Sequence, residues 1–470
     1  MATRTERDPL GEVEVPSEAL YGVQTQRAVD NFPISAIGPH PAFVWATVLI
    51  KKAAAVTHRE TGRLDPKLAD AIVQAADEVL DGLHGDQFVV DVFQAGAGTS
   101  HNMNANELLA NRANELLGGS RGDYDPVHPN DHVNMAQSTN DIIPTAIALA
   151  ALHLLQPLYE ALDGLAASLE RKSEEWDGIV KSGRTHVQDA TPVRLGQEFG
   201  AYAVAVRRGR ERIAAAEVDV QELSIGGTAV GSGLNAEPRY QERVVEVLGE
   251  LSGLTVRRSE NLFYSMQSMS RFAMLSAALK ALAVDLGKLA NDIRLLGSGP
   301  RTGISEIRLP AVQPGSSIMP GKVNPVMAEC LNMICFQVLG NDLAVTMAAV
   351  AGQLQLNVMM PVIAHNLSQS IDILANGCKQ FDELGVRGLE PDETMIRHWL
   401  ERNTMLATAL APRIGYAAAA EIAKEAVRTG ESIPDVAKRM TDLSEDELAQ
   451  ALDPAPMTEA GVRAGGGGGG

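Results

Sequence analysis

The chain has 470 residues, a net charge of −19 and only three cysteines. Its 45% hydrophobic and 21% charged residues are typical of a globular protein and exclude long disorder and a disulfide scaffold. A strongly negative surface repels phosphate backbones, so nucleic acid is not an expected partner. Aromatic residues make up only 4%, so the core must be aliphatic and alanine-rich, which favours close helix packing and an all-α fold.

The N-terminal part of the chain, residues 1–140, mixes short helical segments with loops rich in Gly, Asn and Pro. Apolar residues recur at helical spacing over 43–58 and 66–83, and residues 104–117 are a further expected helix. The first residues lack the apolar segment of a signal peptide, and no stretch reaches about 18 uninterrupted apolar residues. We therefore expect a cytoplasmic protein that does not enter a membrane.

Long helical segments dominate residues 141–395. These segments are 145–175, 192–222, 238–250, 262–297, 325–350 and 355–388. Residues 275–296 are apolar on nearly every face, as expected of a helix buried among other helices. Residues 396–464 are more polar and predict a small helical domain, and the six glycines at 465–470 are interpreted as a flexible tail. The sequence thus predicts three domains, of which the middle one is a long helical bundle.

The most informative segment is the loop Gly315-Ser-Ser-Ile-Met-Pro-Gly-Lys-Val-Asn-Pro325, which precedes a helix. Lys322 supplies a cation, and Asn324 supplies an amide. Pro325 suits the first turn of a helix, where free backbone N–H groups and the positive end of the helix dipole attract anions. The loop therefore predicts an anion site for a carboxylate.

Two other polar regions border the long helices. The loop Ser182-Gly-Arg-Thr-His-Val-Gln-Asp-Ala-Thr-Pro192 contains His186, which is a candidate general base, substrate hydrogen-bond partner or structural cap. The polar runs 96–106 and 128–141 supply neutral donors suited to hold a dicarboxylate. These donors are Thr99, Asn102, Ser138, Thr139 and Asn140.

Two weaker patterns suggest ligands but lack the rest of a site. His128 and His132 are four residues apart, as in some zinc sites, but no third ligand stands nearby, so no metal is expected. Residues 226–233 resemble a phosphate loop, yet no strand precedes them and no GK[ST] follows. We interpret this segment as a tight connection between helices, and leave open whether it contacts the active site.

With these loops in view, the chain resembles the aspartase/fumarase superfamily from about residue 4 to residue 458. Residues 315–325 are similar to the signature loop of that family, and residues 98–104, 137–141 and 183–186 agree with its other conserved regions. The resemblance implies an all-helical subunit of three domains and a homotetramer built on a central bundle of twenty helices. It also implies four active sites, each formed by loops of three subunits, that act on a small dicarboxylate without metal or cofactor.

Carried over by motif, Ser316 would be the catalytic base that removes the proton beside a carboxylate, and Lys322 and Asn324 would bind that carboxylate. Fixed positive and N–H groups are needed because proton removal creates a dianionic aci-carboxylate. Glu329 would orient His186. The second carboxylate and the leaving group would be held by Thr99, Asn102, Ser138, Thr139, Asn140, Thr185 and His186. A candidate second anion site consists of His128, Asn130 and Asp131.

Smaller features divide between two branches of the superfamily. Those that resemble the aspartase branch are residues 21–25, 96–107, 137–140 and 352–359. Those that resemble the fumarase branch are residues 128–131 and 408–416. We favour elimination of ammonia from L-aspartate to give fumarate, with the conversion of L-malate to fumarate as the alternative. A catalytically silent helical scaffold is disfavoured because every candidate catalytic residue is present.

Overall fold

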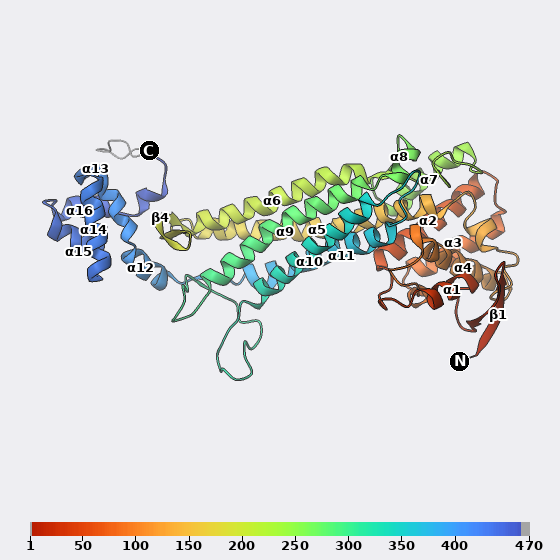
Figure 1. The fold of residues 1–470 in the computed structure, drawn as a ribbon, viewed down its shortest axis with the longest axis horizontal. Coiled ribbons are helices and arrows are strands. Elements are labelled where there is room, and N and C mark those ends of the chain that lie inside the picture. Colours follow the sequence, from red (N-terminus) through yellow and green to blue (C-terminus); the bar gives the residue numbers. More distant parts are fainter. Residues whose placement is uncertain (1, 462–470) are drawn as a thin grey trace. The chain divides into compact units, whose positions relative to one another are not determined.

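The computed structural model describes residues 2–461, and almost all of its regular structure is helical (Figure 1). The all-α fold expected from the sequence is confirmed. The chain divides into two compact units, each assembled from three stretches of sequence. The first unit comprises residues 1–160, 209–283 and 334–376, and the second comprises residues 161–208, 284–333 and 377 onward. The expected glycine tail at 465–470 lies outside the described residues.

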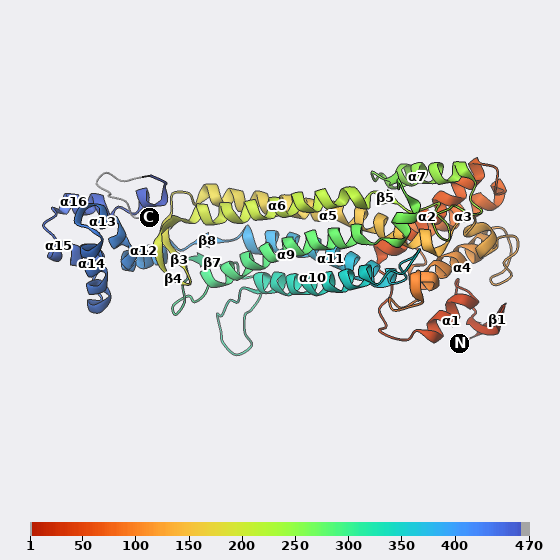
Figure 2. The same ribbon diagram turned by 45° about the horizontal axis from the view of Figure 1, so that its top comes forward.

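Five helices of the described residues are longer than 20 residues (Figure 2). They are α5 (Thr139–Glu175), α6 (Leu195–Val220), α9 (Ser270–Leu296), α10 (Val326–Val350) and α11 (Met360–Gln380). In the first unit, Asp342 of α10 accepts hydrogen bonds from Ser276 and Lys280 of α9. In the second, Tyr202 of α6 donates to Asp292 of α9 over 2.7 Å. These helices therefore pack against one another within each unit.

The expected helix at 262–297 is wrong in one respect, because it is broken into α8 (Leu262–Gln267) and α9. Ser268 between them is extended, with φ −98° and ψ 122°. Its hydroxyl accepts a hydrogen bond from the N–H of Ser270, the first residue of α9. Serine side chains compete for backbone hydrogen bonds and favour helix starts, so a new helix begins here.

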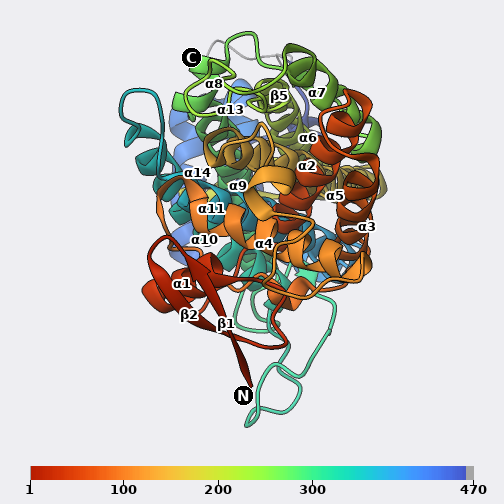
Figure 3. The same cartoon turned by 90° about the vertical axis from the view of Figure 1, so that its right-hand side faces the viewer.

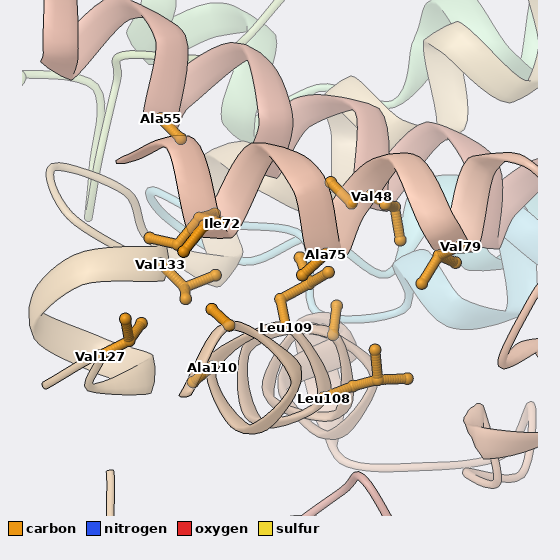
Figure 4. Packing of buried hydrophobic residues seen from close by; sticks show 14 of the residues in the cluster. Val48, Ala55, Ile72, Ala75, Val79, Leu108, Leu109, Ala110, Val127 and Val133 are labelled. Atoms are coloured by element: carbon orange, nitrogen blue, oxygen red, sulfur yellow. The ribbon is translucent and has the colours of Figure 1, made fainter. Parts of the chain in front are cut away.

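Four helices form the core of the first unit. They are α2 (Pro41–Glu60), α3 (Pro66–Leu80), α4 (Thr99–Leu116) and α7 (Pro238–Ser252). Proline opens α2 and α3, where its missing N–H costs nothing. Val48, Ile72 and Leu108 are completely buried where α2, α3 and α4 meet (Figure 4). This aliphatic core matches the low aromatic content of the chain.

The strands form only two-stranded sheets within the described residues. The antiparallel pairs are β1 (Thr3–Asp8) with β2 (Gly11–Pro16), β3 (Val180–Thr185) with β4 (Gln188–Arg194), and β7 (Ile307–Arg308) with β8 (Glu390–Pro391). The parallel pair is β5 (Glu222–Leu223) with β6 (Arg257–Arg258). The β1–β2 hairpin packs against α1 (Val23–Asn31) at the edge of the first unit (Figure 3).

The C-terminal part of the second unit is a group of short helices. They are α12 (Glu393–Arg402), α13 (Ala411–Ile414), α14 (Tyr416–Thr429), α15 (Ile433–Met440) and α16 (Glu445–Leu452). Leu410, Ile422 and Val436 form the centre of their own apolar core. Short helical turns complete the chain at Gly85–Gln87 (η1), Gly96–Gly98 (η2), Pro129–Val133 (η3), Phe381–Val386 (η4), Thr404–Leu410 (η5) and Ala455–Thr458 (η6).

Helices α5 and α10 are long and apolar enough to cross a membrane by length and composition alone, each with a segment of mean hydropathy 1.5. That segment is 78% buried in α5, as in the core helix of a globular protein, but only 33% buried in α10. The exposed side of α10 carries large apolar side chains at helical spacing. They are Met333, Phe336, Leu343, Met347 and Val350, each at least 62% exposed. We call these five residues the α10 apolar face.

Candidate active site

Ser316 lies in the second unit, in the long loop between β7 and α10 (Figure 2). Its Oγ accepts hydrogen bonds from the backbone N–H groups of Ile318 (3.2 Å) and Met319 (3.1 Å). Among the described residues, no acceptor takes the hydrogen of this hydroxyl. Two N–H donors on one oxygen would stabilise negative charge at Ser316 Oγ.

The ends of the loop are held together by short backbone contacts. The N–H of Gly315 donates to the carbonyl of Lys322 over 2.9 Å, and Asn324 Nδ2 donates to the carbonyl of Gly315 over 2.7 Å. A Cβ at Gly315 would stand 2.2 Å from the Lys322 carbonyl oxygen, so only glycine fits. Ser316 and Lys322 line one cavity of about 510 Å³. The loop thus places a hydroxyl and an ammonium around one hollow.

Helix α10 begins directly after this loop. Lys322 is exposed, and no carboxylate among the described residues pairs with its ammonium. Glu329 lies in the first turn of α10, where the positive end of the helix dipole stabilises a negative charge. No hydrogen bond joins Glu329 to His186 within the described chain, so the expected orienting contact stays a prediction. The anion site at Lys322 and the start of α10 therefore stays a prediction.

Thr185 and His186 sit at the tip of the β3–β4 hairpin, which the sequence suggested only as a polar loop. His186 and Val187 form its two-residue turn with φ of 57° and 59°. Both residues at the centre of such a turn need positive φ, which non-glycine residues adopt rarely and often at functional sites. The side chains of Thr185 and His186 are exposed, so the hairpin presents them for contact.

Under this hairpin lies a buried ionic cluster that the sequence did not reveal. Lys181 is 2.9 Å from Glu306 and 3.0 Å from Glu198, and Arg184 is also 2.9 Å from Glu306. The side chains of Lys181 and Glu306 are 1% and 0% exposed. Burial raises the pKa of Glu198, although Lys181 opposes the effect. Because β7 follows Glu306 directly, the cluster ties the hairpin to the strand that leads into the Ser316 loop.

The first unit contributes a second group of site candidates, at the starts of α4 and α5. Thr99 is exposed in the first turn of α4, and Thr139 opens α5. Helix starts favour carboxylates because they present free N–H groups and a positive dipole end. Gly98 precedes Thr99 with φ +84°, and a Cβ there would stand 3.0 Å from Ile143 of α5. The two helix starts are therefore closely packed.

A buried lysine, which the sequence interpretation missed, lies behind these helix starts. Lys51 of α2 is 0% exposed. Its ammonium donates to three side-chain amide oxygens, those of Asn102 (2.7 Å), Asn134 (2.9 Å) and Gln137 (2.9 Å). Asn102 Nδ2 in turn donates to Thr139 Oγ1 over 3.1 Å. Asn102 is itself only 1% exposed, so it lies behind Thr139. A lysine within the apolar face of α2 was the signal available in the sequence.

Asp141, also completely buried, connects the start of α5 to the glycine-rich segment 226–233. Its carboxylate accepts hydrogen bonds from the N–H groups of Ser138 (2.9 Å), Gly226 (3.1 Å) and Thr228 (2.8 Å). Burial raises the pKa of Asp141 to about 7 and lowers that of Lys51 to about 7, while their mutual attraction opposes both shifts.

The segment 226–233 is a tight connection, as interpreted from the sequence. A Cβ at Gly227 would stand 2.4 Å from Met266 Sδ, so the chain passes too close for a side chain. The carbonyl of Ala229 accepts a hydrogen bond from Asn140 Nδ2 over 2.8 Å. The segment therefore contacts one of the candidate substrate-binding residues.

His128, Asn130 and Asp131 lie together around η3 in the first unit. His128 Nδ1 accepts hydrogen bonds from the N–H groups of Asn130 and Asp131, both at 3.3 Å. His132 Nδ1 accepts from the N–H of His128 over 2.8 Å. These histidines therefore cap the local backbone. Within residues 2–461, no group of three His, Cys, Asp or Glu side chains is placed to hold a metal ion.

Comparisons with known proteins show which family the chain belongs to. The family profile described as Lyase matches residues 11–340, and the profile described as Fumarase C C-terminus matches residues 406–459. The aspartate ammonia-lyase of Bacillus subtilis is 47% identical over 98% of this chain and 97% of its own length. The class II fumarate hydratase of Halobacterium salinarum is 51% identical over 98% of each chain.

Solved structures give the same result. A cobalt-bound fumarate lyase:delta crystallin from Brucella melitensis superposes with a TM-score of 0.93 and 47% identity over 98% of this chain and 100% of its own. The class II fumarase of Schistosoma mansoni has the same TM-score and 37% identity over 97% and 99% of the two chains.

A long-helix subunit with a Gly- and Pro-bracketed serine–lysine loop defines a lyase that is related to enzymes of fumarate metabolism. The chain belongs to the aspartase/fumarase superfamily.

Proposed function

We propose that this chain is an aspartate ammonia-lyase that converts L-aspartate reversibly to fumarate and ammonia. The observation that carries the proposed elimination is the Ser316 oxygen, held by two backbone N–H groups beside the free ammonium of Lys322. A serine acts as a base only where its oxyanion is stabilised, and this loop supplies that stabilisation.

The proposed reaction starts with transfer of the Cβ proton of L-aspartate to Ser316 Oγ. The electrons of the broken C–H bond first move into the adjacent carboxylate, which becomes a dianionic aci-carboxylate. They then return to form the C=C bond as the C–N bond breaks, and nitrogen leaves as ammonia. Lys322 and the N–H groups at the start of α10 face the carboxylate that gains charge in this step. Asn324 has one amide hydrogen in the loop contact and a second for that carboxylate. Glu329 would orient His186, which would contact the substrate with Thr185.

The second carboxylate and the amino group are assigned to the first unit. Thr99 and Thr139 start neighbouring helices there, and Ser138 and Asn140 flank Thr139. Asn102 supports Thr139 from behind. These groups are neutral, which suits a leaving ammonia, because it departs without first taking a proton from an acid.

Fumarate hydratase is the second candidate function. The 51% identity to the enzyme of Halobacterium salinarum favours it, as does the segment containing His128, Asn130 and Asp131, a candidate second anion site. A hydroxide leaving group needs a general acid, because its departure as hydroxide is too costly near neutral pH. Thr139 has one methyl group more than a serine and narrows the pocket slightly. One methyl group discriminates between two substrates by only about 1–3 kcal/mol, so Thr139 does not decide between L-aspartate and L-malate.

We also propose that the protein acts as a homotetramer of about 200 kDa, four times the 50.0 kDa chain, with each site formed by three subunits around a twenty-helix bundle. The α10 apolar face supports this assembly, because a mostly exposed helix of mean hydropathy 1.5 needs a covering surface. Mixing Ser316→Ala subunits with His186→Ala subunits should then restore part of the activity. We propose in addition that the enzyme is cytoplasmic and needs neither a metal nor an organic cofactor.

The test is purified protein mixed with fumarate, with ammonium in one sample and none in the other, followed by product identification. L-aspartate formed only with ammonium is the expected result. L-malate formed equally in both samples would assign the chain to the hydratases instead. No product in either sample would favour the silent scaffold.

A further inference from the structure

Lys51 is a charged side chain in the interior of the first unit, where the buried Asp141 carboxylate attracts it without a direct hydrogen bond. It is completely buried in α2, and its ammonium donates hydrogen bonds to three neutral amide oxygens. Burying an ammonium is costly unless its hydrogen bonds are made, and here all three are made. An apolar residue would avoid that cost, so the position calls for a reason beyond packing.

The bonding capacity of each group fixes the direction of a chain of hydrogen bonds. The attraction of the buried Asp141 carboxylate favours the charged form of Lys51. An ammonium can only donate, so in this form Lys51 makes the Asn102 side chain present its oxygen inward and its NH2 group outward. That NH2 group donates to Thr139 Oγ1 over 3.1 Å. Among the described residues, no acceptor takes the Thr139 hydrogen. The hydroxyl is half-buried at the start of α5, and its hydrogen remains for a ligand.

We propose that Lys51 is a positioning residue that acts through Asn102 to turn the Thr139 hydroxyl hydrogen toward a substrate carboxylate. The inference rests on the proposed function, because it takes a dicarboxylate as the ligand of Thr139. It assigns to Asn102 an orienting role in place of direct substrate contact. The chain of donors then runs from Lys51 through Asn102 and Thr139 to the carboxylate.

The sharpest variant is Asn102→Asp, which keeps the shape of the side chain and its contact with Lys51. The new carboxylate can accept from Lys51 but cannot donate. The Thr139 hydroxyl must then donate to it, and the hydroxyl lone pair faces the ligand instead of the hydrogen. Loss of one hydrogen bond to a charged group should weaken binding about tenfold to a hundredfold.

The measurement is the dissociation constant of succinate by calorimetry on the assembled enzyme. Succinate is a saturated dicarboxylate that needs no turnover. Thr139→Val should weaken binding as much as Asn102→Asp does, and the double variant should bind no worse than either single variant. Thr139→Ser keeps the hydroxyl and should bind succinate with near wild-type affinity, unlike Thr139→Val. The matched control is Lys52→Met, at the neighbouring lysine whose partner is the surface residue Asp77, and it should bind as wild type.

If the fold-increases in the dissociation constant caused by Asn102→Asp and Thr139→Val multiply in the double variant, the two residues act independently and the inference is overturned. Wild-type affinity in Asn102→Asp would also overturn it. If Asn102→Asp does not fold, Lys51→Met combined with Thr139→Val gives a second double-mutant cycle. The expected result is the same: the double variant should bind succinate no worse than either single variant. Failure of the wild-type enzyme to bind succinate would instead contradict the proposed function. The two failures are therefore distinguishable.

Discussion

Ser316 has the most sharply defined role among the individual residues. Ser316→Ala should lower kcat by more than about 10³-fold, because a general base contributes typically 10²–10⁴-fold and no neighbouring group holds an equivalent oxyanion. The far-ultraviolet circular dichroism spectrum should not change. Ser317→Ala, at the next residue along the same loop, is the matched control and should keep wild-type turnover.

Retention of more than about a tenth of the activity by Ser316→Ala would contradict the assignment of the base. His186, at the exposed tip of the β3–β4 hairpin, would then become the candidate.

Lys322 should act on both binding and turnover. Lys322→Met should raise KM as well as lower kcat, because the ammonium meets the carboxylate before and during proton removal. Steady-state kinetics with L-aspartate measures both constants. A lower kcat with an unchanged KM would show that Lys322 contacts the substrate only in the transition state. Lys288→Met, on the exposed side of α9, provides a lysine control in the same unit.

The sequence identified residues that stand in polar loops, and it missed those that lie within helices. Ser316 and Lys322 were visible because glycine and proline bracket them in a loop. Lys51 was not, because one lysine in an alanine-rich helix resembles a surface residue until its neighbours are known, which come from α4 and from the loop between η3 and α5. The buried pair of Lys181 and Glu306 was missed for another reason, because the two residues are more than a hundred positions apart in the chain.

At the scale of elements, helix periodicity predicted the long helices well. The expected segments 145–175 and 325–350 correspond to α5 and α10, although α5 begins earlier, at Thr139. The β3–β4 hairpin was not predicted, because its turn residues His186 and Val187 are not the glycine or asparagine that positive φ usually selects. Tertiary contacts to Glu306 hold this turn.

Helix α4 carries a titratable group that links stability to pH. His101 is completely buried, its Nε2 is 2.9 Å from Thr47 Oγ1, and its ring stacks on Phe43. Burial, assisted by the charge of Lys51, lowers its pKa to about 3. Unfolded histidine titrates near 6.5, so the unfolded chain binds more protons between these values. The contribution of His101 to the free energy of unfolding therefore falls as the pH drops below about 6.5.

His101→Gln should remove this contribution. The loss of unfolding free energy between pH 7.5 and pH 5 should be about 2 kcal/mol smaller per subunit than in the wild type. Urea unfolding at the two pH values measures this difference. An equal pH dependence in both proteins would show that His101 protonates in the folded state.

For the whole molecule, the α10 apolar face is the feature that a single subunit leaves unexplained. Phe336→Asp should dissociate the tetramer, because a carboxylate would be buried without a partner in the assembled bundle. Light scattering should show a particle well below about 200 kDa, with activity lost because shared sites need several subunits. Tyr416→Asp, at an exposed aromatic residue of α14, is the matched control. An active monomer would contradict both the assembly and the shared sites.

The measurement that tests the central claim most directly is fumarate formation from L-aspartate and from L-malate at equal concentration, followed by absorbance. The account predicts that the wild type forms fumarate faster from L-aspartate and releases one ammonium for each fumarate. It also predicts that Ser316→Ala forms no fumarate. Faster formation from L-malate with L-aspartate inert would contradict the proposed substrate. Undiminished turnover by Ser316→Ala with either substrate would contradict the proposed chemistry of the loop.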